Sequence, residues 1–184
     1  MDFIIFLFYL LMSTRRLPKK LFTNAQNNPI ISLIESQDVN SALIKFERFR
    51  NQGLKPTLIT YSKIIHAFAK QGFVQKAEDT FQLMQDDGYS PNVIIYSSLI
   101  NAFAQQKNMI KARSVLDEMK SNNIPRNNVV YNTLIRGYCD CDMISEAEDL
   151  IQQMYSENIP RDSFTYNTIL NGFTKSGNIE KALE

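Results

Sequence analysis

A tyrosine returns every 35 residues along this chain, and that spacing constrains the fold more than any other feature. The four members are Tyr61, Tyr96, Tyr131 and Tyr166. A fixed period between about 20 and 50 residues indicates a tandem array, in which each repeat is one supersecondary element stacked on its copies. The positions that vary between repeats are therefore where function is expected.

Each repeat opens with the pattern of an amphipathic helix. The third and fourth residues after the tyrosine are aliphatic and the seventh is aromatic, as in Ile64, Ile65 and Phe68. Apolar residues at this spacing form one stripe along a helix. The residue before the aromatic is always small, the four members being Ala67, Ala102, Gly137 and Gly172.

A second apolar stripe follows in each repeat and includes an alanine in constant register. Its members are Ala42, Ala77, Ala112, Ala147 and Ala182. A small residue inside a bulky stripe is what two helices need where their backbones approach closely. The sequence thus predicts a hairpin of two helices that cross at this alanine.

The turns between repeats carry the residues that end one helix and begin the next. Glycine or asparagine, which tolerate the left-handed conformation that closes a helix, occurs at Gly53, Gly88, Asn123 and Asn158. A polar residue that can cap the next helix occurs at Thr57, Asn92, Asn127 and Asp162. These signals predict an all-α solenoid of stacked helical hairpins.

The register divides the chain into a leader and five repeats. Residues 58–92, 93–127 and 128–162 are full repeats, 23–57 is a degenerate one and 163–184 is a truncated one. The last segment stops inside a second helix without the polar face that a terminal repeat needs, which predicts further repeats or a protein partner there.

Residues 1–22 form an apolar and basic leader. Ten apolar residues, about half of what a membrane-spanning helix requires, precede Arg15, Arg16, Lys19 and Lys20. From Phe3 to Ile34 there is no acidic residue. A basic stretch of this kind is typical of organelle import, and we expect a mitochondrial location, with the plastid as the alternative. A weak membrane anchor and a misassigned start codon are the other interpretations.

Composition argues against several kinds of site. Cys139 and Cys141 have no second ligand pair, and the one histidine, His66, lies two repeats away, so no metal site is predicted. Cys139 shares its column with Ala69 and Ala104, which predicts a small buried side chain. Because no nucleophile motif or phosphate-cradling loop appears, we expect neither an enzyme nor a cofactor.

The motifs in these repeats resemble the pentatricopeptide repeat in its plain 35-residue form. The resemblance is carried by the run from Tyr131 to Cys139, by Ala147 to Leu150 and by the turn from Asn158 to Pro160. The related tetratricopeptide repeat has 34 residues and a tryptophan signature, whereas this chain has no tryptophan. The resemblance implies a right-handed α-solenoid and covers about residues 24–184.

The resemblance also implies binding of single-stranded RNA, with about one base read by each repeat. In the family, the selector is the residue after the tyrosine together with the last residue of the same repeat. The pairs are Ser62 with Asn92, Ser97 with Asn127, and Asn132 with Asp162, while Asn167 begins a fourth. Serine with asparagine is an adenine pair and asparagine with aspartate a uracil pair, which implies 5′-AAU-3′ followed by a pyrimidine.

Neighbouring columns supply the expected contacts to base faces and phosphates. The residues three before each selector would wedge between successive bases, and are Ile59, Ile94, Val129 and Phe164. Lys70 and Lys175 end their first helices in one column and are candidate phosphate contacts. Because other repeats place Gln105 and Asp140 there, we expect a shallow salt dependence.

Three functions stay open on the sequence. The first is sequence-selective RNA binding that supports organelle RNA processing, stability or translation. The second is a protein-binding scaffold like that of tetratricopeptide repeats, and the third is an enzyme whose catalytic domain belongs to a longer chain. The selector asparagines and aspartate also have a structural interpretation as helix caps, and the serines and asparagines after the tyrosines are common in a first helical turn.

Overall fold

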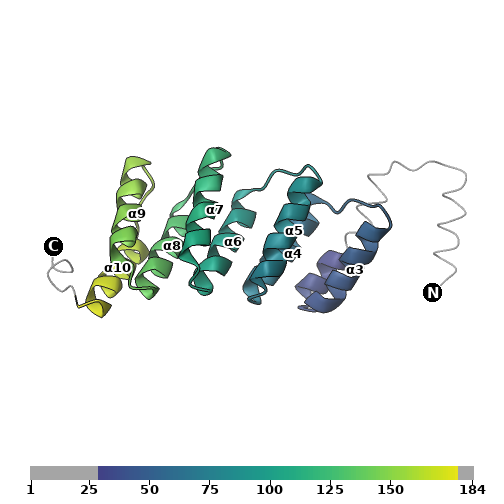
Figure 1. Ribbon diagram of the computed structural model, residues 1–184, viewed down its shortest axis with the longest axis horizontal. Helices are drawn as coiled ribbons and strands as arrows, with labels where there is room; N and C mark the ends of the chain where they lie inside the picture. The colour runs from purple at the N-terminus through teal and green to yellow at the C-terminus, as the bar shows by residue number, and fades with distance from the viewer. Residues whose placement is uncertain (1–28, 178–184) are drawn as a thin grey trace, which may run out of the picture. The chain divides into compact units, whose positions relative to one another are not determined.

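The computed structural model describes residues 29–177 (Figure 1). By contacts it divides into two compact units, Met1–Ile64 and Ile65–Glu184. The expected leader at 1–22 and most of the second helix of the truncated repeat, with Ala182, lie outside the described residues.

The first compact unit contains a helical stretch at 29–35, helix α3 (Val39–Asn51) and the start of α4 (Leu58–Lys70). Its apolar residues Phe46 and Tyr61 are buried and meet edge to face, with ring centroids 5.5 Å apart. Arg50 donates a hydrogen bond to the Tyr61 hydroxyl. An ion pair of 2.8 Å between Lys63 Nζ and Glu35 Oε1 joins α4 to the stretch at 29–35.

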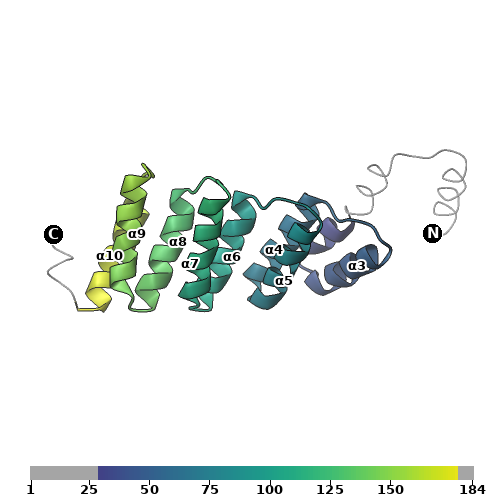
Figure 2. The same cartoon turned by 45° about the horizontal axis from the view of Figure 1, so that its top comes forward.

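The second compact unit is built from helices of equal length, each 13 residues long, that lie side by side (Figures 1 and 2). They are α5 (Val74–Asp86), α6 (Val93–Gln105), α7 (Met109–Ser121), α8 (Asn128–Asp140), α9 (Ile144–Ser156) and α10 (Ser163–Lys175). Helices α6, α8 and α10 begin at the first residues of the repeats expected from the sequence.

The helices of this unit pack in two layers. The first helices touch one another, α6 against α8 and α8 against α10. Helix α7 packs on α6 and α8, and α9 packs on α8 and α10, so each of these second helices touches the first helix of its own repeat and that of the next. The predicted crossing alanines Ala77, Ala112 and Ala147 are completely buried. The stacked-hairpin prediction is therefore confirmed, and one face of the stack is lined by first helices alone.

The turn chemistry predicted from the sequence is also confirmed. Asn123 and Asn158 have φ of 54° and 55°, in the left-handed region that closes a helix. Asn92, Asn127 and Asp162 cap α6, α8 and α10, each accepting a backbone N–H from three residues further on at 3.0, 3.1 and 2.9 Å. Their structural interpretation as caps is thus correct, and any role in binding must coexist with it.

Cys139 is a packing residue, as its column predicts. It is buried, and burial together with the neighbouring Asp140 charge raises the pKa of its thiol to about 11. Across residues 29–177, no group of three or more histidine, cysteine or acidic side chains is arranged to hold a metal ion. None of the helices in that stretch has the length and apolar character that crossing a bilayer requires.

Tyr166, the fourth repeat tyrosine, differs from the others in its exposure to solvent. Tyr96 and Tyr131 are buried, but Tyr166 is 47% exposed, and Leu170 beside it is also exposed. The Tyr131 hydroxyl is covered by Glu157, 26 residues further on.

Candidate nucleic-acid interface

An apolar side chain is exposed at the second position of each of the helices α4, α6, α8 and α10. The four residues predicted to wedge between bases are each more than half exposed, namely Ile59 (62%), Ile94 (61%), Val129 (59%) and Phe164 (51%). Single exposed apolar residues need no explanation. Within the second unit, the column of Ile94, Val129 and Phe164 at one position of successive repeats marks a surface suited to flat apolar partners.

One helical turn after this column, the selector residues of repeat 128–162 are joined to each other. The Asn132 Nδ2 donates to Asp162 Oδ1 at 3.2 Å, and the Asn132 side chain is buried. The other amide atom, Oδ1, accepts from the hydroxyl of Thr165 at 2.7 Å. The two residues that the resemblance pairs across 30 positions therefore form one hydrogen-bonded group between α8 and α10.

The carboxylate in this group is held ionised by its hydrogen bonds. The backbone N–H of Thr165 does most to lower the pKa of Asp162, and the amides of Asn132 and Asn128 add to this effect. The amide of Asn128 reaches the second carboxylate oxygen, Oδ2, at 2.8 Å. This end of the site presents a fixed negative acceptor with amide donors beside it.

A hollow of about 320 Å³ opens beside this group. Its lining consists of Asn128, Val129, Asn132, Thr133, Arg136, Asp162 and Phe164. Two of these are the exposed apolar residues of successive repeats and two are the predicted selectors, so apolar and polar side chains line the hollow together. A second hollow of about 260 Å³ shares Arg136 and Phe164 and extends to Lys175.

The preceding repeat handles its selectors differently. The Ser97 hydroxyl donates to the carbonyl of Val93 in its own helix at 2.7 Å. Asn127 uses Oδ1 to cap α8 and is exposed. Within the described residues no hydrogen bond joins the two side chains, and Asn127 Nδ2 has no partner. This pair is adaptable, whereas the Asn132 pair is fixed.

The remaining predicted selectors are Ser62, Asn92 and Asn167. Ser62 is half-buried in the first compact unit, and Asn92 is half-buried at the start of α6 in the second. Asn167 is exposed on α10. His66, one turn after Ser62, has its Nδ1 3.1 Å from the hydroxyl of Ser98.

Positive charge on this face is sparse. Of the two predicted phosphate contacts, Lys70 is exposed at the end of α4, while Lys175 Nζ lies 3.3 Å from Asp140 Oδ1 in the same column of the preceding repeat. That pair is 63% and 49% exposed, and such surface pairs stabilise little. Arg136 is an exposed cation shared by both hollows.

Two contributors to this site, Thr165 and Asn128, were not predicted from the sequence. A signal for the first was visible. The residue before each repeat tyrosine is Thr60, Ile95, Val130 or Thr165. A threonine three residues after a capping aspartate is the spacing of a reciprocal cap, and the structure shows that cap at Asp162 and Thr165.

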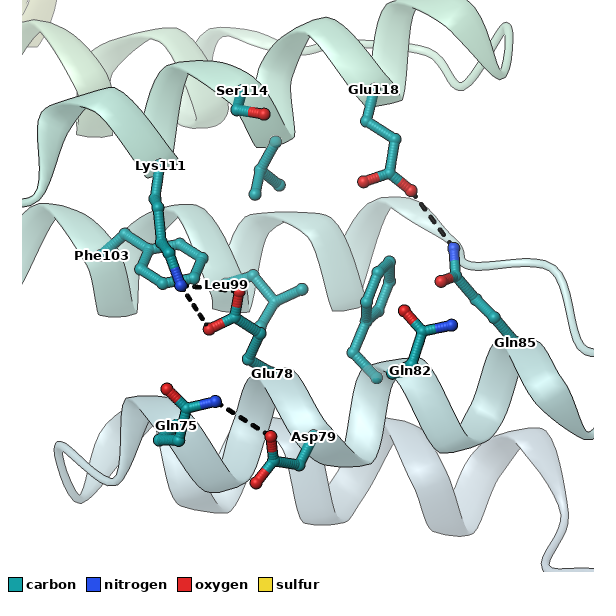
Figure 3. A pocket seen from close by; sticks show the side chains of 12 residues that line it. Gln75, Glu78, Asp79, Gln82, Gln85, Leu99, Phe103, Lys111, Ser114 and Glu118 are labelled. Atoms are coloured by element: carbon teal, nitrogen blue, oxygen red, sulfur yellow. Dashed lines mark hydrogen bonds and ion pairs between the residues drawn. The ribbon is translucent and has the colours of Figure 1, made fainter.

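A larger hollow, of about 470 Å³, lies between α5, α6 and α7 (Figure 3). Its charged and amide side chains satisfy one another: Lys111 Nζ is 2.7 Å from Glu78 Oε2, and Gln85 donates to Glu118 at 3.2 Å. This hollow involves the second helices and needs no ligand to complete its hydrogen bonds. The candidate site is therefore the groove between α8 and α10.

Two family models match the sequence. The PPR repeat family matches residues 126–175, and the pentatricopeptide repeat domain matches residues 30–71, 44–106 and 79–140. No curated protein matches the chain.

Solved structures of similar proteins extend this result. The pentatricopeptide repeat protein PPR10 from maize is 28% identical, with a TM-score of 0.76 over 85% of this chain and 22% of that one. PPR10 in complex with an 18-nt psaJ RNA element is 24% identical, with a TM-score of 0.72 over 87% of this chain and 24% of that one. The PPR domain of Arabidopsis thaliana protein-only RNase P 1 in complex with tRNA is 16% identical, with a TM-score of 0.75 over 90% of this chain and 86% of that one.

This chain thus spans about a fifth of the length of the maize protein that it matches. The matches at lower identity show the same fold. With the family models covering more than half of the sequence, the chain belongs to the pentatricopeptide repeat family, and its fold is an all-α helical-repeat solenoid.

Proposed function

We propose that this chain binds single-stranded RNA along the face lined by its first helices, with one repeat taking one base. The observation that carries the proposal is the hollow between α8 and α10, which is lined by Val129 and Phe164 together with the hydrogen-bonded pair of Asn132 and Asp162. Structures of PPR10 with an RNA element and of a PPR domain with tRNA support it by similarity of fold.

The chemistry of this hollow fits uracil. The Watson–Crick edge of uracil has one N–H donor between two carbonyl acceptors. Asp162 is an acceptor and the Asn132 amide supplies a donor beside it, so the two side chains complement that edge. Val129 and Phe164 would hold the base by its faces, a stacking contact worth ~1–3 kcal/mol per base.

The other repeats extend the target to 5′-AAU-3′ followed by a pyrimidine. Ser62 with Asn92 and Ser97 with Asn127 would each read adenine, whose edge offers a donor and an acceptor that an amide can match. Asn167 would begin the pyrimidine site. Lys70, Lys175 and Arg136 would contact phosphates, and because they are few, affinity should fall only shallowly with salt.

Selection of bound sequences from a random RNA pool tests the proposal. We expect enrichment of AAU with a pyrimidine after it. As a sharper arm, Phe164→Ala should weaken binding about tenfold, since it removes one stacking wall. Ile110→Ala is the matched control, because Ile110 is 84% exposed on α7, a second helix. A chain that ignores every RNA sequence yet binds a peptide along this face would instead be the protein-binding scaffold.

We further propose that the chain acts in an organelle, the mitochondrion or alternatively the plastid, in RNA processing, stability or translation. The support is the basic leader at 1–22. Fusing these residues to a fluorescent reporter tests it, with import expected and loss of import expected when the four basic residues are changed to glutamine. A reporter that stays outside both organelles would contradict the location.

A further inference from the structure

Thr165 sits where the two selector residues of repeat 128–162 meet. It is completely buried at the start of α10. Its hydroxyl oxygen lies 2.7 Å from Asn132 Oδ1, 3.0 Å from Asp162 Oδ1 and 3.2 Å from the backbone nitrogen of Asp162. A threonine hydroxyl has one proton to donate and can accept from others. Either Asn132 Oδ1 or Asp162 Oδ1 can receive that proton.

The other hydrogen bonds of the group decide which of them does. The backbone N–H of Asp162 donates to the Thr165 hydroxyl. Asp162 Oδ1 already accepts the Thr165 backbone N–H and the Asn132 amide. The proton of the hydroxyl therefore goes to Asn132 Oδ1, which is also the shortest of its contacts.

This bond fixes the direction of the Asn132 amide. With Oδ1 turned toward Thr165 and Nδ2 toward Asp162, each end of the amide faces the atom type that it can bond. One of the two Nδ2 hydrogens goes to Asp162, and the other remains for a base in the adjoining hollow. The amide can thus offer a donor to the base while its acceptor is withheld.

Because Asn132 Oδ1 is bonded to Thr165, the site should favour uracil over cytosine. Uracil offers an N–H to Asp162 and a carbonyl to the Asn132 amide. Cytosine offers a ring nitrogen that only accepts, which would oppose the carboxylate, and an amino group that needs an acceptor. Asn132 Oδ1 is the acceptor that would serve that amino group if Thr165 did not occupy it.

We infer that Thr165 is a positioning residue that sets the preference for uracil over cytosine in this repeat. The inference rests on the proposed RNA-binding function and adds a specificity determinant to the two selectors. It also explains why the residue at this repeat position can differ between repeats. In the repeat whose selector is Ser97, the same position is Val130, and the serine satisfies its own hydroxyl on the backbone of its helix.

The test is the Thr165→Val variant of the full chain. Valine has nearly the same shape, and the buried Val130 shows that the column accepts it. Affinity is measured for two RNA oligomers that differ only by uracil or cytosine at the third selected base. We expect the uracil-to-cytosine affinity ratio to fall about three- to tenfold, since the freed Oδ1 becomes available to the amino group. Ratios at the two adenine positions should not change.

Two further variants separate positioning from general packing. Thr165→Ser keeps the hydroxyl and should restore the ratio of the natural chain. Thr168→Val is the matched control, because Thr168 is a buried threonine of the same helix whose hydroxyl bonds to the carbonyl of Phe164. Thermal unfolding followed by circular dichroism reports whether each variant is folded. If Thr165→Val does not fold, Thr165→Cys gives the same comparison, because a thiol is a much weaker donor.

The outcomes distinguish this inference from the function on which it rests. A folded Thr165→Val variant that binds RNA with an unchanged uracil-to-cytosine ratio overturns the role of Thr165 and leaves the proposed function standing. Absence of RNA binding by the natural chain overturns both. A ratio that falls equally in Thr165→Val and Thr168→Val overturns the positioning argument, because the effect would then be one of helix stability.

Discussion

Repeats 93–127 and 128–162 have the same backbone but hold their polar side chains in different ways. In the first, Ser97 bonds to its own helix and the amide nitrogen of Asn127 is left without a partner among the described residues. In the second, Asn132 is tied to Asp162 and to Thr165. One column can therefore hold an adaptable polar side chain in one repeat and a prearranged one in the next.

The tyrosine at the centre of each repeat shows the same contrast. The Tyr96 hydroxyl donates to Glu118 at 3.1 Å and accepts from the Asn122 amide at 2.8 Å. The Tyr131 hydroxyl donates to Glu157 at 2.7 Å, and Glu157 also binds Arg126 at 2.9 Å. The neutral Asn122 in one repeat is thus replaced in the other by Glu157, which forms an ion pair with Arg126.

The largest expected effect comes from converting the second repeat into the first. The triple change Asn132→Ser, Asp162→Asn and Thr165→Val gives repeat 128–162 the polar residues of repeat 93–127. We expect the preference at its base to move from uracil to adenine, a change in the affinity ratio on the order of 100-fold, because donors and acceptors are exchanged. Competition binding with oligomers that differ at this base measures it.

The double change without Thr165→Val serves as the control for this prediction. It leaves a buried hydroxyl facing a shorter serine, so the shift toward adenine should be smaller. Preferences at the other bases should stay as they are in both variants. If the triple variant still prefers uracil, the pairwise assignment of the selectors is wrong.

The next largest effect is expected on stability, from substitutions where two first helices are in contact. A methyl group on Gly172 would meet Cys139 Sγ at 2.6 Å and Cβ at 3.1 Å, where α10 crosses α8. Gly172→Ala should therefore lower the free energy of unfolding by about 1–3 kcal/mol through overpacking. Adding Cys139→Ala should recover most of it, since Ala69 and Ala102 form the same pair of columns earlier in the chain.

The equivalent change where α8 crosses α6 should cost less. A methyl group on Gly137 would meet the end of the flexible Met109 side chain at 2.8 Å and Ala104 Cβ at 3.2 Å. The thioether can move aside, so Gly137→Ala should destabilise less than Gly172→Ala. Urea unfolding of the two variants compares them. Equal losses would show that the helices themselves shift, rather than the side chains.

Much of this arrangement was predictable from the sequence, because repeats reveal packing by comparison. Buried columns such as Tyr96 and Ala112 recur, so their role follows from period alone. The bond between Asn132 and Asp162 was not predictable, because it depends on the distance between two stacked helices. The role of Thr165 depends on hydrogen-bond directions, for which residue type gives no rule. Tyr166 shares the column of Tyr96 and Tyr131 but is exposed, which the period alone does not predict.

The tyrosine contacts predict a difference in pH dependence. Burial opposes ionisation of Glu157, but the hydrogen bonds from Tyr131 and Arg126 and the charges of Arg126 and Lys120 outweigh it and lower its pKa below 4.5. A carboxyl whose pKa is lower in the folded state than in the unfolded state stabilises the fold at neutral pH. That contribution is lost as the pH falls through the folded pKa.

Glu157→Gln tests this by placing a neutral amide in the column of Asn122. It should cost about 1 kcal/mol at pH 7, since a hydrogen bond to a charged group is lost. The difference between the natural chain and the variant should shrink as the pH falls below about 4, where the carboxyl of the unfolded chain is protonated. Denaturant unfolding at several pH values measures it. A difference that does not depend on pH would mean that Glu157 acts by packing alone.

The smallest effect is expected at the turn inside each hairpin, where the two repeats differ again. Lys107 and Asp142 each have φ of 58°, and the matching residues elsewhere are Gly72 and Gly177. Aspartate tolerates the left-handed region better than lysine does. Lys107→Gly should therefore stabilise the fold by about 0.5 kcal/mol, a gain limited by the greater freedom of glycine in the unfolded chain. Asp142→Gly should be nearly neutral. Melting temperatures of the two variants compare them, and a larger gain for Asp142→Gly would show that an interaction of the side chain, and not backbone strain, decides the stability of this turn.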